Sequence, residues 1–131
     1  MVDLFPEPRT TAQRRSAAAL GHTVVVPPGA EWAPTVPFVE PSEGVWRASL
    51  YHDVLYRCRG NLTRTPVKVF NSCGNPRTLV SRKFADKFWL ARMAAEEAPY
   101  ATRRSMYDVV RAAGLPGWIE KDQVSYATAP R

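Results

Sequence analysis

Apolar residues recur at the three- and four-residue spacing of an amphipathic helix in three segments of the chain. These segments predict helices over residues 42–58, 81–98 and 102–113. Ser42 and Ser81 stand where N-caps are expected, because a serine hydroxyl can accept a hydrogen bond from the free N–H groups of a first helical turn. We expect the first two helices to form an antiparallel pair, to which a third helix is added.

Two short segments have the residue pattern of strands. His22–Val26 is a β-branched run that stops at a Pro-Pro-Gly turn, and Pro66–Phe70 alternates in polarity. Residues 71–76 are rich in turn formers. Thr78–Val80 is therefore expected to return beside Pro66–Phe70 and to complete a small hairpin.

Together these elements predict an α+β fold that is mainly α: an antiparallel helix pair, a third helix, a small β-hairpin and a Pro-rich loop over residues 30–41. Residues 1–22 are polar and mixed, and predict an N-terminal arm with a short helical piece at Thr11–Leu20. A single globular domain is expected over residues 23–118, followed by a C-terminal tail over residues 119–131.

The composition is that of a folded protein. The 131 residues are 45% hydrophobic and include four Trp, five Tyr and five Phe, enough for the core of one domain. No run approaches the roughly 18 apolar residues that a membrane span needs, so no integral membrane segment is expected. The first residues carry charges and prolines where a secretory signal would be apolar. We therefore expect synthesis in the cytoplasm, with Cys58 and Cys73 as free thiols.

The net charge of +6 is concentrated between Arg57 and Lys87, where the only acidic residue is Asp86. A basic stretch of this kind favours an anionic partner, although it can also be a solvated, solubilising face. A nucleic acid is the partner we favour least, because the stretch has no interleaved aromatic residues and no known binding motif. The residues expected to contact an anionic surface are Arg57, Arg59, Arg64, Lys68, Arg82 and Lys83.

Asp86 has an unusual position in the second predicted helix. It is in register with Trp89, Leu90 and Met93 at the spacing i, i+3, i+4 and i+7, so the carboxylate is expected to face the core or a pocket. Removing a lone carboxylate from water costs several kcal/mol, and Asp86 therefore needs a partner. His52 on the first helix is a candidate.

His52 and Tyr56 lie on one stripe of the first predicted helix, and Asp53 is rotated from His52 by about 100°. In one interpretation His52 and Asp86 form a catalytic dyad with Tyr56 as support, and Asp53 holds a hard cation beside it. In the other, His52, Asp86 and Tyr56 form a satisfied core network that fixes two helices together. The residues alone leave both open, and we favour the second.

Several segments, in their order and spacing, resemble a phage- and prophage-encoded family catalogued as domain of unknown function thirteen fifty-three. They are Val26–Gly29, Pro34–Pro37, Tyr51–Tyr56, Ser81–Asp86 and Tyr107–Arg111, followed by Gly114 and Trp118. The resemblance extends from about Val24 to Trp118, and its specific part is the pair of motifs around His52 and Asp86. Members usually carry Thr-Asp where this chain has Glu31 and Trp32, so a loop aspartate is missing here.

A looser similarity covers only the two helices. Secreted and parvoviral phospholipases A2 pair a His-Asp-x-x-Tyr helix with an aspartate on an antiparallel helix. His52, Asp53, Tyr56 and Asp86 match those positions, and the similarity implies the roles of base, calcium ligand, support and orienting acid. The chain departs from those enzymes in its Pro-rich upstream loop, where they carry a Gly-rich calcium loop, and in lacking their disulfides.

The phage-family resemblance implies a virion component of the tail, neck or an associated appendage. Such a protein would be made in the host cytoplasm, would contact other virion proteins in multiple copies and would need no cofactor. The alternative is a hydrolase similar to phospholipase A2, which uses the His-Asp dyad with the assistance of calcium.

Overall fold

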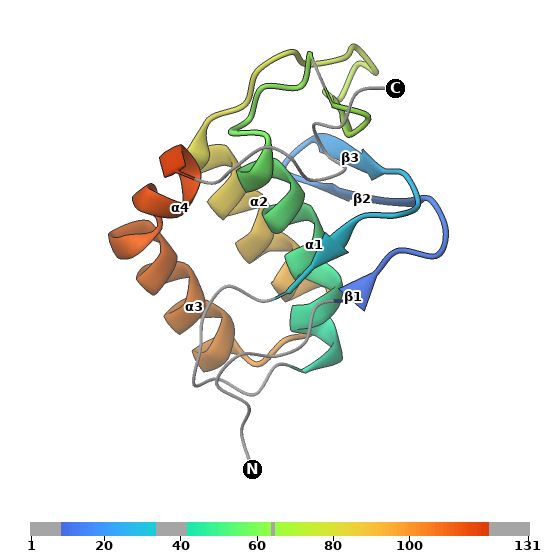
Figure 1. The fold of residues 1–131 in the computed structure, drawn as a ribbon. Coiled ribbons are helices and arrows are strands. Elements are labelled where there is room, and N and C mark those ends of the chain that lie inside the picture. The colour runs from blue at the N-terminus through green and yellow to red at the C-terminus, as the bar shows by residue number, and fades with distance from the viewer. Residues whose placement is uncertain (1–8, 34–41, 64, 121–131) are drawn as a thin grey trace.

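The computed structural model describes residues 9–33, 42–63 and 65–120. Within them the fold is α+β and mainly α, as predicted, with helices packed against small antiparallel sheets (Figure 1). The strands are β1 (Arg9–Thr10), β2 (Arg15–Ala19), β3 (His22–Val26), β4 (Glu31–Trp32) and β5 (Lys68–Phe70), and the helices are α1 (Glu43–Arg57), α2 (Arg82–Ala95), α3 (Tyr100–Ala113) and α4 (Leu115–Glu120).

Both predicted N-caps are confirmed. The Ser42 Oγ accepts a hydrogen bond from the backbone N–H of Val45 over 3.3 Å, and the Ser81 Oγ accepts one from Phe84 over 3.0 Å. Each cap satisfies a backbone donor that has no partner inside its own helix. The two serines therefore fix where α1 and α2 begin. The positions of His52 and Asp86 along their helices follow from these starting points.

Contacts between α1 and α2 run in opposite directions along the two helices. Ser49 meets Trp89, His52 meets Asp86, and further along α1 Tyr56 meets Arg82. Residue numbers that rise on α1 pair with numbers that fall on α2, so the helices are antiparallel, as predicted. The strands lie on one side of this pair, and α3 and α4 lie on the other (Figure 1).

The N-terminal part of the chain differs from its prediction. The helical piece expected at Thr11–Leu20 is wrong, because Arg15–Ala19 forms strand β2 and pairs antiparallel with all of β3. β1 likewise pairs with β4. An alanine-rich segment can be either helix or strand, and here the backbone groups of β3 supply the partner. The described residues of the expected arm thus belong to the folded domain.

The predicted pairing of Pro66–Phe70 with Thr78–Val80 in a hairpin is also wrong. Lys68–Phe70 forms strand β5, but it pairs with β3 to complete the sheet order β2-β3-β5. The Thr78–Val80 segment is not a strand, and Leu79 instead makes an isolated bridge to Asn61. A turn does form near residues 71–76, where Phe70 bridges Pro76. The chain returns beside β5 only as far as Arg77, whose N–H donates to the Val69 carbonyl oxygen over 2.7 Å. Thr78 and Val80 instead bond the backbone at Leu62 and Gly60.

The helix pair and the sheet enclose one hydrophobic core. Val24, Val54, Phe88 and Trp89 have no exposed surface, and Trp32 packs edge-on against Trp46. Residues 34–41 of the expected Pro-rich loop, Arg64 and most of the expected tail lie outside the described residues. Among the described helices, none has the length and apolar character that would be needed to cross a membrane.

Candidate functional site

The centre of the candidate site is a contact between His52 on α1 and Asp86 on α2. His52 Nε2 lies 2.8 Å from Asp86 Oδ1, within the hydrogen-bond distance expected from the sequence. His52 is 1% exposed and Asp86 has no exposed surface. The amphipathic register of Asp86 therefore predicted both its burial and its partner correctly.

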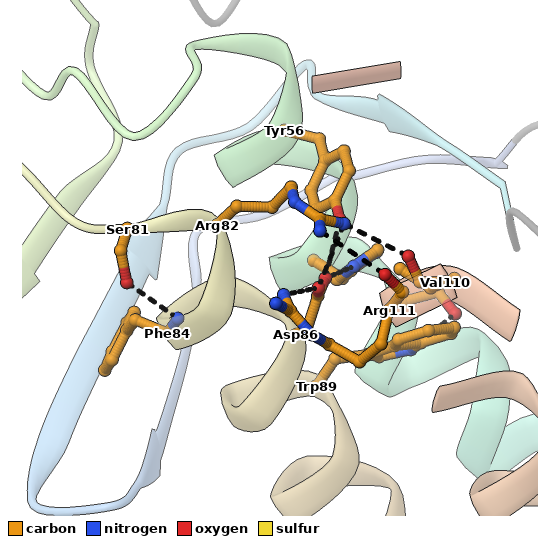
Figure 2. A network of polar contacts seen from close by, with 10 residues as sticks. Tyr56, Ser81, Arg82, Phe84, Asp86, Trp89, Val110 and Arg111 are labelled. Atoms are coloured by element: carbon orange, nitrogen blue, oxygen red, sulfur yellow. Dashed lines mark hydrogen bonds and ion pairs between the residues drawn. The ribbon is translucent and has the colours of Figure 1, made fainter. Parts of the chain in front are cut away.

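Asp86 accepts two further hydrogen bonds, one from α1 and one from α3 (Figure 2). The Tyr56 hydroxyl donates to Oδ1 over 2.7 Å, and Arg111 of α3 donates to Oδ2 through Nη1 over 2.6 Å. Arg82, one turn before Asp86 on α2, places its Nη1 3.6 Å from the same oxygen. The carboxylate thus joins α1, α2 and α3 at one point.

Arg82 also connects this point to the end of α3. Its Nη1 donates to the carbonyl oxygen of Val110 over 3.1 Å and to the Tyr56 hydroxyl over 3.4 Å, and its Nη2 donates to the carbonyl oxygen of Arg111 over 3.4 Å. The Val110 carbonyl also accepts from the backbone N–H of Gly114 over 2.7 Å, so Arg82 adds a second donor there. Its positive charge is favourable at the negative end of the helix dipole. We call His52, Tyr56, Arg82, Asp86 and Arg111 the Asp86 network.

The electrostatics of the network favour an ionised Asp86. Burial by itself raises the pKa of this carboxyl, but hydrogen bonds from His52, Tyr56 and Arg111 outweigh it, and the pKa is lowered. The pKa of Tyr56 is raised, first by burial and then by its hydrogen bond to Asp86. The hydrogen bond to Asp86 raises the pKa of Arg111. An ionised carboxylate can only accept, so His52 Nε2 carries the proton in this contact.

Aromatic side chains enclose the His52 ring. The Trp89 ring stacks on it with centroids 4.2 Å apart, and the Tyr56 ring lies tilted with its centroid at 4.4 Å. Trp89 is fixed in turn by a hydrogen bond from its indole Nε1 to the Ser49 hydroxyl, over 3.2 Å. Among the described residues, His52 Nδ1 has no hydrogen-bond partner, so the nitrogen opposite the Asp86 contact keeps its lone pair.

Asp53 stands beside this network but takes no part in it. Its carboxylate is 5% exposed and lies 3.3 Å from Nε of Arg57, one turn further along α1. No group of three acidic, histidine or cysteine side chains within residues 9–33, 42–63 and 65–120 could hold a metal ion. Arg57 thus lies beside the one carboxylate proposed as a calcium ligand, and most of the upstream loop that the calcium prediction also concerns lies outside the described residues.

The six basic residues expected to form an anionic-partner surface do not all face outward. Arg82 contacts the Asp86 network and Arg57 lies beside Asp53, so both side chains already have an acidic neighbour within the fold. Contact of these residues with an anionic partner stays a prediction. Arg59, Lys68 and Lys83 are exposed, and Arg64 lies outside the described residues. Charge density along the sequence cannot distinguish a solvated cation from one that is recruited by a buried carboxylate.

The two cysteines differ in their exposure to solvent. Cys58 is buried, Cys73 is exposed, and both are free thiols, as predicted. Burial raises the pKa of the Cys58 thiol to about 11.

Trp118 meets the Tyr56 ring edge-on with centroids 5.0 Å apart, next to the Asp86 network. Trp32, where the resembling family has aspartate, donates from its indole to the carbonyl oxygen of Trp46 over 2.8 Å.

Sequence reasoning missed Arg111. It lies in the last turn of α3, where a basic residue is common in any helix, so its type and position carried no specific signal. A buried carboxylate at Asp86 predicts a cationic partner, but the sequence does not indicate which of the many arginines binds it.

Comparison of the chain with family models, with curated proteins and with solved structures found no match. The resemblances to the phage-encoded family and to phospholipase A2 therefore stay predictions, and the functional argument rests on the geometry described above.

Proposed function

We propose that this protein is a structural or assembly component of a bacteriophage particle, in the tail, neck or an associated appendage, and that it works through contacts with other virion proteins. The phage context comes from the resemblance carried by the motifs around His52 and Asp86. The non-enzymatic role is supported by one observation above all: Asp86 of α2, which has no exposed surface, takes its hydrogen-bond donors from α1 and α3 and so joins three helices.

The Asp86 network has the features of a structural joint. Both oxygens of the carboxylate accept hydrogen bonds, and Arg82 and Arg111 supply two positive charges. A catalytic carboxylate needs only to orient its histidine, whereas this one also holds the end of α3 through two arginines. Fully satisfied buried polar networks fix a unique packing, and a protein that docks on others needs a fixed shape.

Particle composition tests the first part of the proposal. Particles from a host carrying this gene are purified on a density gradient, and the chain is quantified by mass spectrometry against the major capsid protein. We expect it at a constant ratio, in multiple copies, through repeated washing. Its removal by washing to the level of an added soluble marker protein would refute a place in the virion.

Mutation of the network tests the second part. We expect His52→Ala and Asp86→Ala to impair folding or assembly, because removal of one partner from a buried pair leaves the other unpaired at a cost of about 3–5 kcal/mol. His22→Ala replaces the only other histidine, which lies outside the network, and is the control for His52→Ala. Equal assembly of all three variants would contradict a structural role.

A second candidate function is hydrolysis that uses His52 as a general base. The observation that favours it is the orientation of the ring: Asp86 binds Nε2, and Nδ1 is left as an acceptor without a partner in the described residues. That nitrogen could take a proton from water. Because Arg57 already pairs with Asp53, we assign no calcium-dependent step to this site.

A lipid assay distinguishes the two candidates. Wild type and His52→Asn are first compared by circular dichroism to establish that both fold, and are then incubated with mixed phospholipids, with calcium or with chelator. We expect no fatty-acid release from either protein. Release by the wild type that disappears in a stably folded His52→Asn would replace the structural proposal with the hydrolase, and the chelator would show whether calcium is involved.

A further inference from the structure

A groove with a volume of about 560 Å³ lies between α2 and α3, on a part of the surface separate from the Asp86 network. Its apolar lining comes from Leu90, Ala91 and Ala94 of α2, from Tyr100 and Tyr107 of α3, and from Leu20 in the turn between β2 and β3. Three segments far apart in the sequence therefore contribute to one apolar surface.

Leu20 is an unexpected residue in its position. Leu20 and Gly21 form the two-residue turn of the β2–β3 hairpin, with φ of 54° and 72°. Turns with positive φ at both positions favour Asn-Gly or Asp-Gly, because a side chain such as leucine is strained in the left-handed region. Leu20 is nevertheless 52% exposed at the groove. Its side chain gains little from the folded chain itself, which suggests that its role is in contact with a partner.

The charged residues that line the groove are all cations: Lys87, Arg103 and Arg104. Arg103 lies over the Tyr100 ring at 5.2 Å, and Arg104 lies over the Tyr107 ring at 5.3 Å. Arg104 also pairs with Asp108 over 3.4 Å, but both side chains are more than half exposed, so this pair is weak. Lys87 is exposed and forms no ion pair within the described part of the chain. The groove thus combines an apolar lining with positive charge.

We infer that this groove binds an acidic peptide segment with large apolar side chains, contributed by a partner protein. The apolar side chains would pack on Leu20, Leu90 and Tyr100, and the carboxylates would meet the three cations, as in helix-in-groove recognition. A recess between two helices suits inserted side chains better than a flat lipid surface does. A second copy of this chain is disfavoured by charge, because each copy carries +6. The inference goes beyond the proposed function and does not depend on a phage context.

Peptide binding to the full chain tests the charge part of the inference. The probe is a fluorescein-labelled helical peptide of Leu and Glu in amphipathic order, and the same peptide with Lys in place of Glu is its control. We expect saturable anisotropy with the acidic probe only, and about tenfold weaker binding to Lys87→Glu. Lys83→Glu, an exposed change on α2 outside the groove, should bind as the wild type does. Equal affinity of both variants, or equal binding of both peptides, would overturn the inference.

Leu20→Asn tests the apolar part and separates it from folding. Asparagine tolerates positive φ, so the variant should melt at a higher temperature than the wild type while it binds the acidic probe several-fold more weakly. A lower melting temperature would show that Leu20 serves the fold, and unchanged binding would show that it does not contact the probe. Phosphatidylglycerol vesicles form the last arm: binding to them without binding to the acidic peptide would assign the groove to a lipid surface and refute a peptide partner.

Discussion

Arg111 on α3 donates to Oδ2 of Asp86 over 2.6 Å, and so binds the third helix to the carboxylate that His52 and Tyr56 reach from α1. The guanidinium side chain is 31% exposed, whereas Asp86 is fully enclosed. The contact therefore closes the solvent side of the Asp86 network. It also explains how α3, with only Met106 and Val110 buried, is held against the helix pair.

We expect Arg111→Met to lower the free energy of unfolding by about 1.5–3 kcal/mol, the range for a hydrogen bond to a charged group. Methionine keeps the apolar stem of the side chain and removes only its charge and donors. Urea denaturation followed by circular dichroism measures the change. Arg104→Met is the matched control, because its ion pair with Asp108 is largely exposed and should be worth less than about 1 kcal/mol. Equal losses in the two variants would contradict the proposed role of Arg111.

Stability should fall in acid through Asp86. The pKa of this group is lower in the folded protein than the unfolded value of about 3.9, so its stabilisation is complete above that value and is lost as the pH falls through the folded pKa. Urea denaturation at about pH 7 and about pH 3 measures the difference. Asp86→Asn cannot titrate, so its free energy of unfolding should change less between the two pH values than that of the wild type. An identical change in both proteins would show that other carboxyls carry the effect.

A methyl group at Gly60 should be poorly tolerated for a steric reason. Gly60 has φ of 70°, and an added Cβ would lie 2.0 Å from the backbone oxygen of Val80. Gly74 has φ of 80° but nothing within 4 Å of the corresponding position. In both alanine variants the added Cβ disfavours the positive φ, which lowers the free energy of unfolding by about 1–2 kcal/mol. We therefore expect Gly60→Ala to melt well below Gly74→Ala in calorimetry, and similar melting temperatures would mean that the Val80 segment can move away.

The two thiols should differ sharply in reactivity. Cys58 is buried with a pKa raised to about 11, so almost no thiolate forms at neutral pH, whereas Cys73 is exposed. Titration of the native protein with a chromogenic disulfide reagent should modify one cysteine rapidly, and the second only after denaturant is added. Cys73→Ser should remove the rapid phase. Persistence of that phase in Cys73→Ser would show that the region around Cys58 opens readily.

The sequence by itself determined where α1, α2 and α3 form and the centre of the candidate site. Ser42 and Ser81 act as caps through bonds to their own first turns, and the i, i+3, i+4 register that buries Asp86 is a property of one helix. The pairing of His52 with Asp86 follows from the need of a buried carboxylate for a donor. These features depend on residues within a few positions of one another, or on one strong energetic demand, and such features can be inferred from the sequence.

Tertiary structure decided the strand pairing and the arginine that binds Asp86. For these features the local sequence pattern favoured several partners about equally. The Arg15–Ala19 segment became a strand since β3 offered it an edge, and Lys68–Phe70 joined the other edge of β3 instead of pairing with Thr78–Val80. Arg111, one of many arginines, reached Asp86 only because α3 packs beside α2. The same packing left Leu20 at the groove between α2 and α3. Sequence pattern describes what each segment can do, and the choice among partners follows from which surfaces meet in space.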